Sequence, residues 1–200
     1  MREDPPPPAA STLTERMAKR VRELRAAHSL SLDELATRSG VSRSMISLVE
    51  RAESSPTAVV LEKLATGLGV PLAALFDAPG AAGDPVARVA DQPEWRDPGS
   101  GYVRRNVSPA GFASPLQIVE VSFPAGARVA FDTAARQPRV HQQVWVLEGC
   151  IEVTLGEAHH RLAAGDCLAM VLDQPISYHN PTRKPARYAV VIASEHPTWR

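Results

Sequence analysis

Residues 32–51, LDELATRSGVSRSMISLVER, decide the fold of the first half of the chain. Just before and inside this stretch, Ser31 and Glu34 have the spacing of a capping box, in which each side chain accepts a hydrogen bond from the other residue's backbone N–H at the start of a helix. Gly40 suits the left-handed backbone of a sharp turn, and Ser42 can cap a second helix. Because apolar residues recur at helical spacing on both sides of Gly40, the stretch predicts two short helices in a helix-turn-helix arrangement.

The exposed face of the second predicted helix carries polar side chains on its first turns, where a recognition helix meets the edges of DNA bases. Arg43 can donate two hydrogen bonds to a guanine, whereas serines suit phosphates or either kind of base. The candidate DNA contacts are Ser31, Ser42, Arg43, Ser44 and Ser47, together with Arg16 and Arg20 on a preceding basic helix. The alternative interpretation is a helical hairpin packed for stability, with these side chains merely solvated.

The flanking segments complete a five-helix pattern. Apolar spacing predicts a first helix from Leu13 to near residue 28, a helix over 57–68, and a last short helix over 72–76 that follows Pro71. With the run LDELATRSGVSRSMISLVERAESSPTAVVLEKLATGLGVPLAALF, residues 13–77 resemble the DNA-binding domain of the lambda-repressor-like, xenobiotic-response-element (XRE) family of bacterial regulators. The resemblance implies a helix-turn-helix domain that binds double-stranded operator DNA.

Length and composition suggest two domains in 200 residues, with a balanced formal charge that gives no global attraction to nucleic acid. The proline-rich residues 1–12 are expected to be a disordered tail, and residues 78–100 a linker with a lead-in strand. Two cysteines without an apolar leader fit a reducing cytosol, so a cytoplasmic location is expected. No apolar run is long enough to span a bilayer, and no membrane partner is expected.

Beyond the linker, the hydrophobic period changes from helical to two, which predicts an all-β domain. Short strands are expected at 102–107, 116–123, 143–148, 151–155, 167–172 and 187–193. Turn-forming residues separate these runs, as in an antiparallel sandwich or barrel. The fold class is therefore α plus all-β in two domains.

The second half also resembles a known family. The strand-glycine-strand run VWVLEGCIEV and the AAGD turn are similar to the cupins, whose double-stranded β-helix (jelly-roll barrel) would cover residues 101–200. Cupin enzymes hold a metal with two histidines and a glutamate from one motif and a third histidine from another. In this chain, Gln142 stands at the glutamate position, Ile176 at the third histidine, and residues 135–138 (ARQP) at the first two. We therefore expect no metal and no other cofactor.

The loss of metal ligands suggests that the cavity serves an organic ligand held by a few hydrogen bonds. The candidate ligand-binding residues are His141, Gln142, Val144, Tyr178 and His179. The leading hypothesis is a DNA-binding regulator whose cupin senses a small-molecule effector and mediates homodimerisation. Because the linker is flexible, coupling is expected to run through the spacing of the two heads in the dimer.

Three alternatives stay open. The chain could be a cupin enzyme with a helix-turn-helix head, of the metal-dependent oxygenase or epoxidase type, although the missing ligands disfavour this. The cupin could be a dimerisation scaffold that binds nothing. The remaining histidines, which include His159 and His160, could form an atypical metal site.

Overall fold

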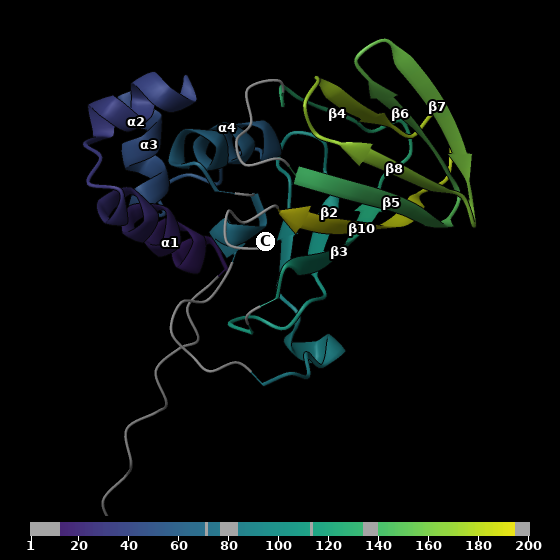
Figure 1. Cartoon of the computed structure of the whole chain (residues 1–200), viewed down its shortest axis with the longest axis horizontal. Helices are drawn as coiled ribbons and strands as arrows, with labels where there is room; N and C mark the ends of the chain where they lie inside the picture. The colour runs from purple at the N-terminus through teal and green to yellow at the C-terminus, as the bar shows by residue number, and fades with distance from the viewer. Residues whose placement is uncertain (1–12, 71, 77–83, 113, 134–139, 195–200) are drawn as a thin grey trace, which may run out of the picture.

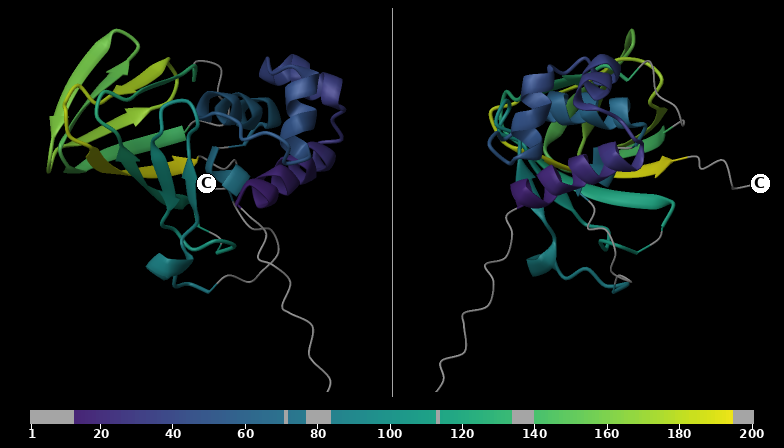
Figure 2. Two further views of the ribbon diagram at one scale, coloured as in Figure 1. Left: turned by 180° about the vertical axis from the view of Figure 1, so that it is seen from behind. Right: turned by 90° about the vertical axis from the view of Figure 1, so that its left-hand side faces the viewer.

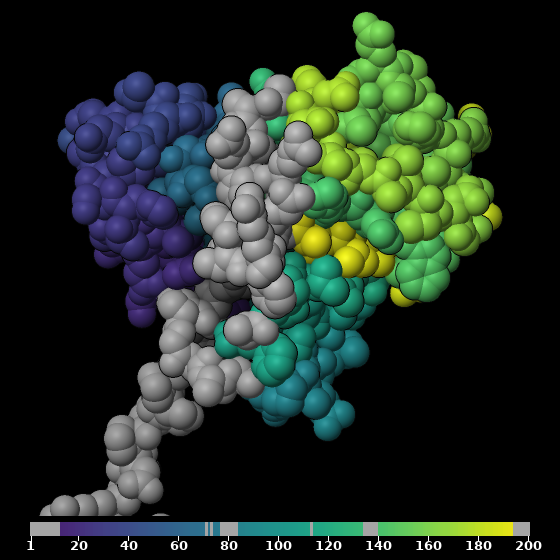
Figure 3. Space-filling model, in the orientation of Figure 1, coloured from purple at the N-terminus to yellow at the C-terminus, as the bar shows by residue number. Residues whose placement is uncertain are grey.

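The computed structural model describes residues 13–70, 72–76, 84–112, 114–133 and 140–194. The predictions for the tail 1–12 and for the first part of the linker, up to residue 83, lie outside these residues. Figure 1 shows a helical head on one side of the molecule and a β-domain on the other, and Figure 3 shows the same division in the space-filling view. Among the described helices, none is both long and apolar enough to cross a membrane.

The head contains the predicted helices at nearly the predicted positions. They are α1 (Leu13–Ala27), α2 (Leu32–Ser39), α3 (Arg43–Glu50), α4 (Ala58–Leu68) and the short η1 (Leu72–Phe76). The last predicted helix is a 3₁₀ helix, so four of the five segments are α-helical.

The ends of these helices follow the local signals in the sequence. Ser31 Oγ accepts from the Glu34 N–H at 3.1 Å, and Glu34 Oε2 accepts from the Ser31 N–H at 2.7 Å, which completes the capping box. These hydrogen bonds hold the pKa of Glu34 below its ordinary value, and the one from the Ser31 backbone N–H has the largest effect. Gly40 ends α2 with φ of 65°, the left-handed conformation that glycine adopts without strain.

A close approach of α2 and α4 fixes the shape of the head. A side chain at Gly67 would lie 2.8 Å from the Ser39 Cβ, so only glycine allows this contact. On the other side, Arg25 Nε and Nη2 donate to the two carboxylate oxygens of Glu50 at 2.6 and 2.8 Å. This paired hydrogen bond raises the pKa of Arg25 and holds α1 against the end of α3.

The β-domain consists of two antiparallel sheets. One has six strands in the order β1-β2-β3-β10-β5-β8, and the other has four in the order β4-β9-β6-β7. The strands are β1 (Glu94–Arg96), β2 (Val103–Asn106), β3 (Leu116–Phe123), β4 (Arg128–Phe131), β5 (Val140–Glu148), β6 (Cys150–Leu155), β7 (Ala158–Ala163), β8 (Cys167–Val171), β9 (Ile176–His179) and β10 (Ala186–Ser194). All six predicted strands are present, and β1 lies within residues 78–100, where a lead-in strand was expected, whereas β4, β7 and β9 were not expected. Strands β4 and β7 carry weak or irregular alternation, and they form because a partner strand offers hydrogen bonds.

One hydrophobic core runs through both domains. The buried cluster includes Leu61 and Leu75 of the head as well as Val144 and Ile151 of the β-domain. Figure 2 shows α4 as the helix nearest the β-domain in the view from behind, and α4 contacts β4. The two domains therefore do not fold around separate cores.

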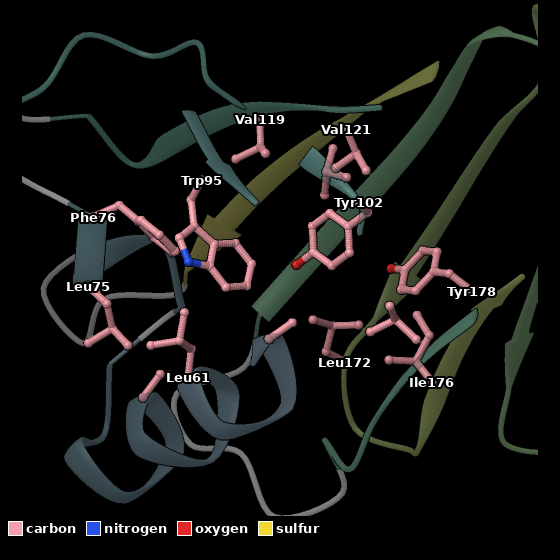
Figure 4. Packing of buried hydrophobic residues seen from close by; sticks show 14 of the residues in the cluster. Leu61, Leu75, Phe76, Trp95, Tyr102, Val119, Val121, Leu172, Ile176 and Tyr178 are labelled. Carbon is pink, nitrogen blue, oxygen red and sulfur yellow. The ribbon is translucent and has the colours of Figure 1, made fainter. Parts of the chain in front are cut away.

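A chain of aromatic rings crosses the junction between the domains (Figure 4). Phe76 of η1 lies 5.9 Å from Trp95 of β1, ring centroid to centroid, and Trp95 lies 5.8 Å from Tyr102. The Ala58 N–H at the start of α4 donates to Asp97 Oδ1 at 2.9 Å, which adds a buried polar contact. The head is thus packed directly on the β-domain, and coupling through the spacing of the two heads in a dimer stays a prediction.

Candidate DNA surface and ligand cavity

The N-terminal turn of α3 presents the predicted DNA-reading side chains to solvent. Ser42 Oγ caps the helix by accepting from the Met45 N–H at 3.3 Å, and it lies 3.2 Å from Ser44 Oγ. The side chain of Arg43 is 65% exposed and its Nε lies 3.3 Å from Asp33 Oδ1 of α2. An exposed ion pair of this kind contributes only about 0–1 kcal/mol, so Arg43 can exchange Asp33 for DNA at little cost.

Three further candidate DNA contacts differ in how exposed their side chains are and in which partners they already have. Arg16 is exposed on α1, and Ser31 is exposed at the start of α2, where its oxygen caps the helix. Ser47 is half-buried, and its hydroxyl accepts a hydrogen bond from the Arg51 guanidinium. Arg51 in turn donates to both carboxylate oxygens of Glu53 at 2.8 Å. Ser47 therefore belongs to a small surface network on α3.

Arg20, a further candidate DNA contact, is engaged in contacts within the head. Its Nε donates to the Ala74 carbonyl of η1 at 3.1 Å, and its Nη1 lies 4.0 Å from Glu23. Only 22% of its side chain is exposed. Because these contacts join α1 to η1, Arg20 has a structural role, and we remove it from the candidate DNA surface.

A cavity of about 80 Å³ lies at the junction between the head and the β-domain. Its walls come from both sheets of the β-domain, and Glu62 of α4 and Leu72 of η1 line it from the head. Since one water needs roughly 10–15 Å³ of such space, the cavity has room for several waters or one small organic molecule. Most of its walls are apolar, as in sites for small organic ligands.

Two of the predicted ligand-binding residues meet inside this cavity. Gln142 of β5 is 7% exposed, and its Nε2 donates a hydrogen bond to Tyr178 Oη of β9. Both residues line the cavity, together with Ile176. Val144 points to the same face of β5 and is fully buried, but it does not line the cavity. The inward direction of Gln142 and Tyr178 was predicted, and their side chains now form one polar pair.

His141 and His179 were placed in the ligand site by prediction, and the structure places them outside it. Each is adjacent in its strand to an inward-facing residue, so the alternation of a strand turns it to the opposite face. His141 is exposed and borders a groove on the outer face of the six-stranded sheet with Leu116 and Val171. His179 Nδ1 lies 3.0 Å from Glu152 Oε2 on the outer face of the other sheet.

The most polar part of the cavity wall was not predicted from the sequence. Arg104 of β2 is only 6% exposed, and its guanidinium carbon lies 5.1 Å from the centre of the Phe76 ring. Tyr102 and Tyr188 also line the cavity. A signal was present, since Arg104 follows Tyr102 by two residues and must share its face of the strand.

The residues at the cupin ligand positions do not suit a metal. Gln142 offers a neutral amide already joined to Tyr178, and Ile176 offers only hydrocarbon. Among the residues that the structure describes, no three histidine, cysteine, aspartate or glutamate side chains form a group that could hold an ion. His159 Nδ1 lies 3.0 Å from Thr154 Oγ1 at the surface, away from the cavity.

Comparison with known proteins gives independent results for the head and for the whole chain. The helix-turn-helix family HTH_3 matches residues 21–75. The HTH-type transcriptional regulator SutR of Escherichia coli (strain K12) is 44% identical over 62 residues, which are 31% of this chain and 35% of SutR. The chain therefore matches about a third of the length of this curated relative.

Solved structures also resemble the chain. An HTH_3 family transcriptional regulator from Vibrio cholerae aligns with 92% of this chain and 98% of its own, with a TM-score of 0.74 and 28% identity. The Cupin_2 domain of an XRE family transcriptional regulator from Enterobacter cloacae aligns with 48% of this chain and 98% of its own, with a TM-score of 0.43 and 17% identity.

Proposed function

We propose that this chain, an XRE-type helix-turn-helix protein with a cupin-like β-domain, regulates transcription by binding specific operator DNA as a homodimer under the control of a small organic ligand. The observation that carries the proposal is the exposed N-terminal turn of α3, which presents Ser42, Arg43 and Ser44 on a helix fixed by α1 and α2. The match of residues 21–75 to the HTH_3 family supports the same use of this helix.

In this proposal α3 enters the major groove with its N-terminal end. Arg43 leaves Asp33 and reads a guanine, while the serines and Arg16 hold phosphates. A single short helix buries too little surface for useful specificity, so two heads bind half-sites about one helical turn apart.

We further propose that dimerisation uses the outer face of the six-stranded sheet. Three large apolar side chains on this face are about half exposed, namely Leu116 (50%), Ile118 (41%) and Trp145 (51%). They come from β3 and β5, which flank β10 in the sheet, so they share one surface. A second copy of the chain would cover this apolar face and would bring a second α3 to the DNA.

The β-domain in this proposal is a double-stranded β-helix. Strands β3, β10, β5 and β8 form one sheet, and β4, β9, β6 and β7 form the other, so consecutive strands mostly alternate between sheets. This order supports a jelly roll, whose interior is a common place for a ligand. The cavity beside Gln142 and Tyr178 is the proposed ligand site.

The alternative of a metal-dependent enzyme is disfavoured by the donor set. A cupin oxygenase needs ionised or imidazole ligands, and Gln142 and Ile176 supply neither at their positions. The alternative of a β-domain that only dimerises predicts that no small molecule changes the affinity for DNA.

The test begins by sequencing the genomic DNA fragments that the purified full-length chain selects. On the selected operator, Arg43→Ala should weaken binding by about 1–3 kcal/mol, with a much smaller loss on random DNA. Lys63→Ala, which removes an exposed cation from α4 rather than from α3, is the matched control. An equal loss for Arg43→Ala on operator and on random DNA would show that Arg43 contacts phosphate only.

A further inference from the structure

The wall of the junction cavity holds a positive charge that the proposed function does not yet use. Building on that function, we infer that the ligand is a small monocarboxylate whose acid group binds Arg104. The inference specifies the chemical class of the ligand and the residue that recognises it.

The position of Arg104 favours a planar anion. Its Nε lies 3.3 Å from Asn106 Oδ1, and its guanidinium lies over the Phe76 ring, so two neighbours hold the plane of the group in place. A guanidinium fixed in this way presents its N–H donors as a fork that matches the two oxygens of a carboxylate. In a buried site such a pair is stronger than it is in water.

Phenol groups add neutral donors next to this charge. Burial raises the pKa of Tyr102 to about 12 and that of Tyr188 well above its ordinary value, while the charge of Arg104 lowers both. The hydroxyls therefore stay protonated at physiological pH and can donate to a carboxylate. Tyr178 stacks on Tyr188 with ring centroids 6.0 Å apart, and Figure 4 shows its hydroxyl turned toward Tyr102.

The rest of the cavity limits the body of the ligand. Val121, Val129, Leu172 and Ile176 give apolar walls, and the volume suits an acid of about three to seven carbons. At the head side, the buried carboxylate of Glu62 lines the same space. A second negative charge on the ligand would be repelled there, so we expect a monoanion rather than a dicarboxylate.

The same site links the ligand to the head. Arg104 touches Phe76 of η1, while Glu62 and Leu72 belong to α4 and η1. An acid bound at Arg104 therefore contacts both domains, and it stabilises the arrangement of head and β-domain that fits it better. The change in operator affinity can be no larger than the difference in ligand affinity between the two arrangements.

The test uses calorimetry to compare how tightly a carboxylate and its matched primary amide bind to the full-length protein. The probes are propanoate, butanoate, 4-methylpentanoate and benzoate, each beside its primary amide, with succinate as the dianion. At least one acid should bind tenfold or more tightly than its amide, and succinate should bind more weakly than butanoate. Because this comparison uses the wild type, it does not depend on the folding of a variant.

Variants then assign the preference to Arg104. Arg104→Gln should bind the acid at least tenfold more weakly and should no longer distinguish it from the amide, whereas Arg104→Lys should keep part of the preference. The inference is overturned if no acid binds, if acid and amide bind equally, or if Arg104→Gln keeps the preference.

Operator binding separates this inference from the proposed function. If a neutral compound binds and alters operator affinity while the acids do not, the inference fails and the function stands. If the chain selects no DNA sequence, the function fails whatever the acids do.

Discussion

Replacing Phe76 with alanine tests whether the two domains form one cooperative unit. Phe76 is 7% exposed, packs against Trp95 at 5.9 Å and lies beneath the Arg104 guanidinium at 5.1 Å. Removing a buried phenylalanine costs about 3–5 kcal/mol. That range already includes an aromatic pair of about 0.5–1.5 kcal/mol and a partly desolvated cation–π contact of about 2 kcal/mol. The loss is a large share of the roughly 5–15 kcal/mol by which a native protein is stable.

The assay is urea unfolding followed by two signals. Far-UV circular dichroism reports mainly on the helical head, and the fluorescence of Trp95 reports on the junction. Trp145 and Trp199 are first changed to phenylalanine so that Trp95 is the only indole in the chain. In the parent the two curves should coincide, because one core runs through both domains. Phe76→Ala should lower the free energy of unfolding by about 3–5 kcal/mol and should separate the two curves.

The matched control is Phe112→Ala, since Phe112 is 51% exposed and packs little surface. It should change the free energy of unfolding by no more than about 0.5 kcal/mol. Equal losses for Phe76→Ala and Phe112→Ala, or separate curves already in the parent, would refute a shared core at the junction.

Three further results are expected. Trp145→Asp should convert the dimer to monomer in light scattering and weaken operator binding. Val89→Asp, at a 68% exposed site outside the sheets, should do neither. A Trp145→Asp variant that stays dimeric would contradict the proposed dimer face. Burial raises the pKa of Asp97, but hydrogen bonds from Ser100, Ala58 and Gly99 outweigh it and leave the pKa below the ordinary 3.8. The carboxylate therefore adds stability above about pH 4 that is lost as the pH falls through the lowered pKa, and Asp97→Asn should remove that part of the acid dependence in thermal unfolding. Protein offered iron, manganese, nickel or zinc should retain well under one equivalent after desalting; a full equivalent that Gln142→Ala abolishes would restore the enzyme hypothesis.

The strands of the β-domain show where sequence patterns are sufficient. β3 was predicted with its observed bounds, because Leu116–Phe123 alternates strongly enough to define its inward face. β4 and β9 are four residues each, and their partners make them strands, since β4 pairs with β9 and β9 also pairs with β6. A short segment gives too few alternations to be recognised alone, so its partner decides its structure.

The cavity residues show that the alternation of a strand decides which side chains face inward. His141 and Gln142 are neighbours in β5, and Tyr178 and His179 are neighbours in β9, so only one of each pair can face inward. Naming both members of each pair as ligand residues contradicted the period of two. Gln142 and Tyr178 face inward as predicted, whereas both histidines face outward for a reason that the sequence already contained.

The sequence by itself determined the helix-turn-helix. Its signals are local, since a capping box at Ser31, a left-handed Gly40 and a cap at Ser42 each act within four residues of the chain. The tertiary structure alone decided that the head packs on the β-domain and that Arg104 lies over Phe76 at a cavity shared by both. That contact joins residues 28 positions apart on two different domains, and no periodicity records which surfaces of two folded domains meet.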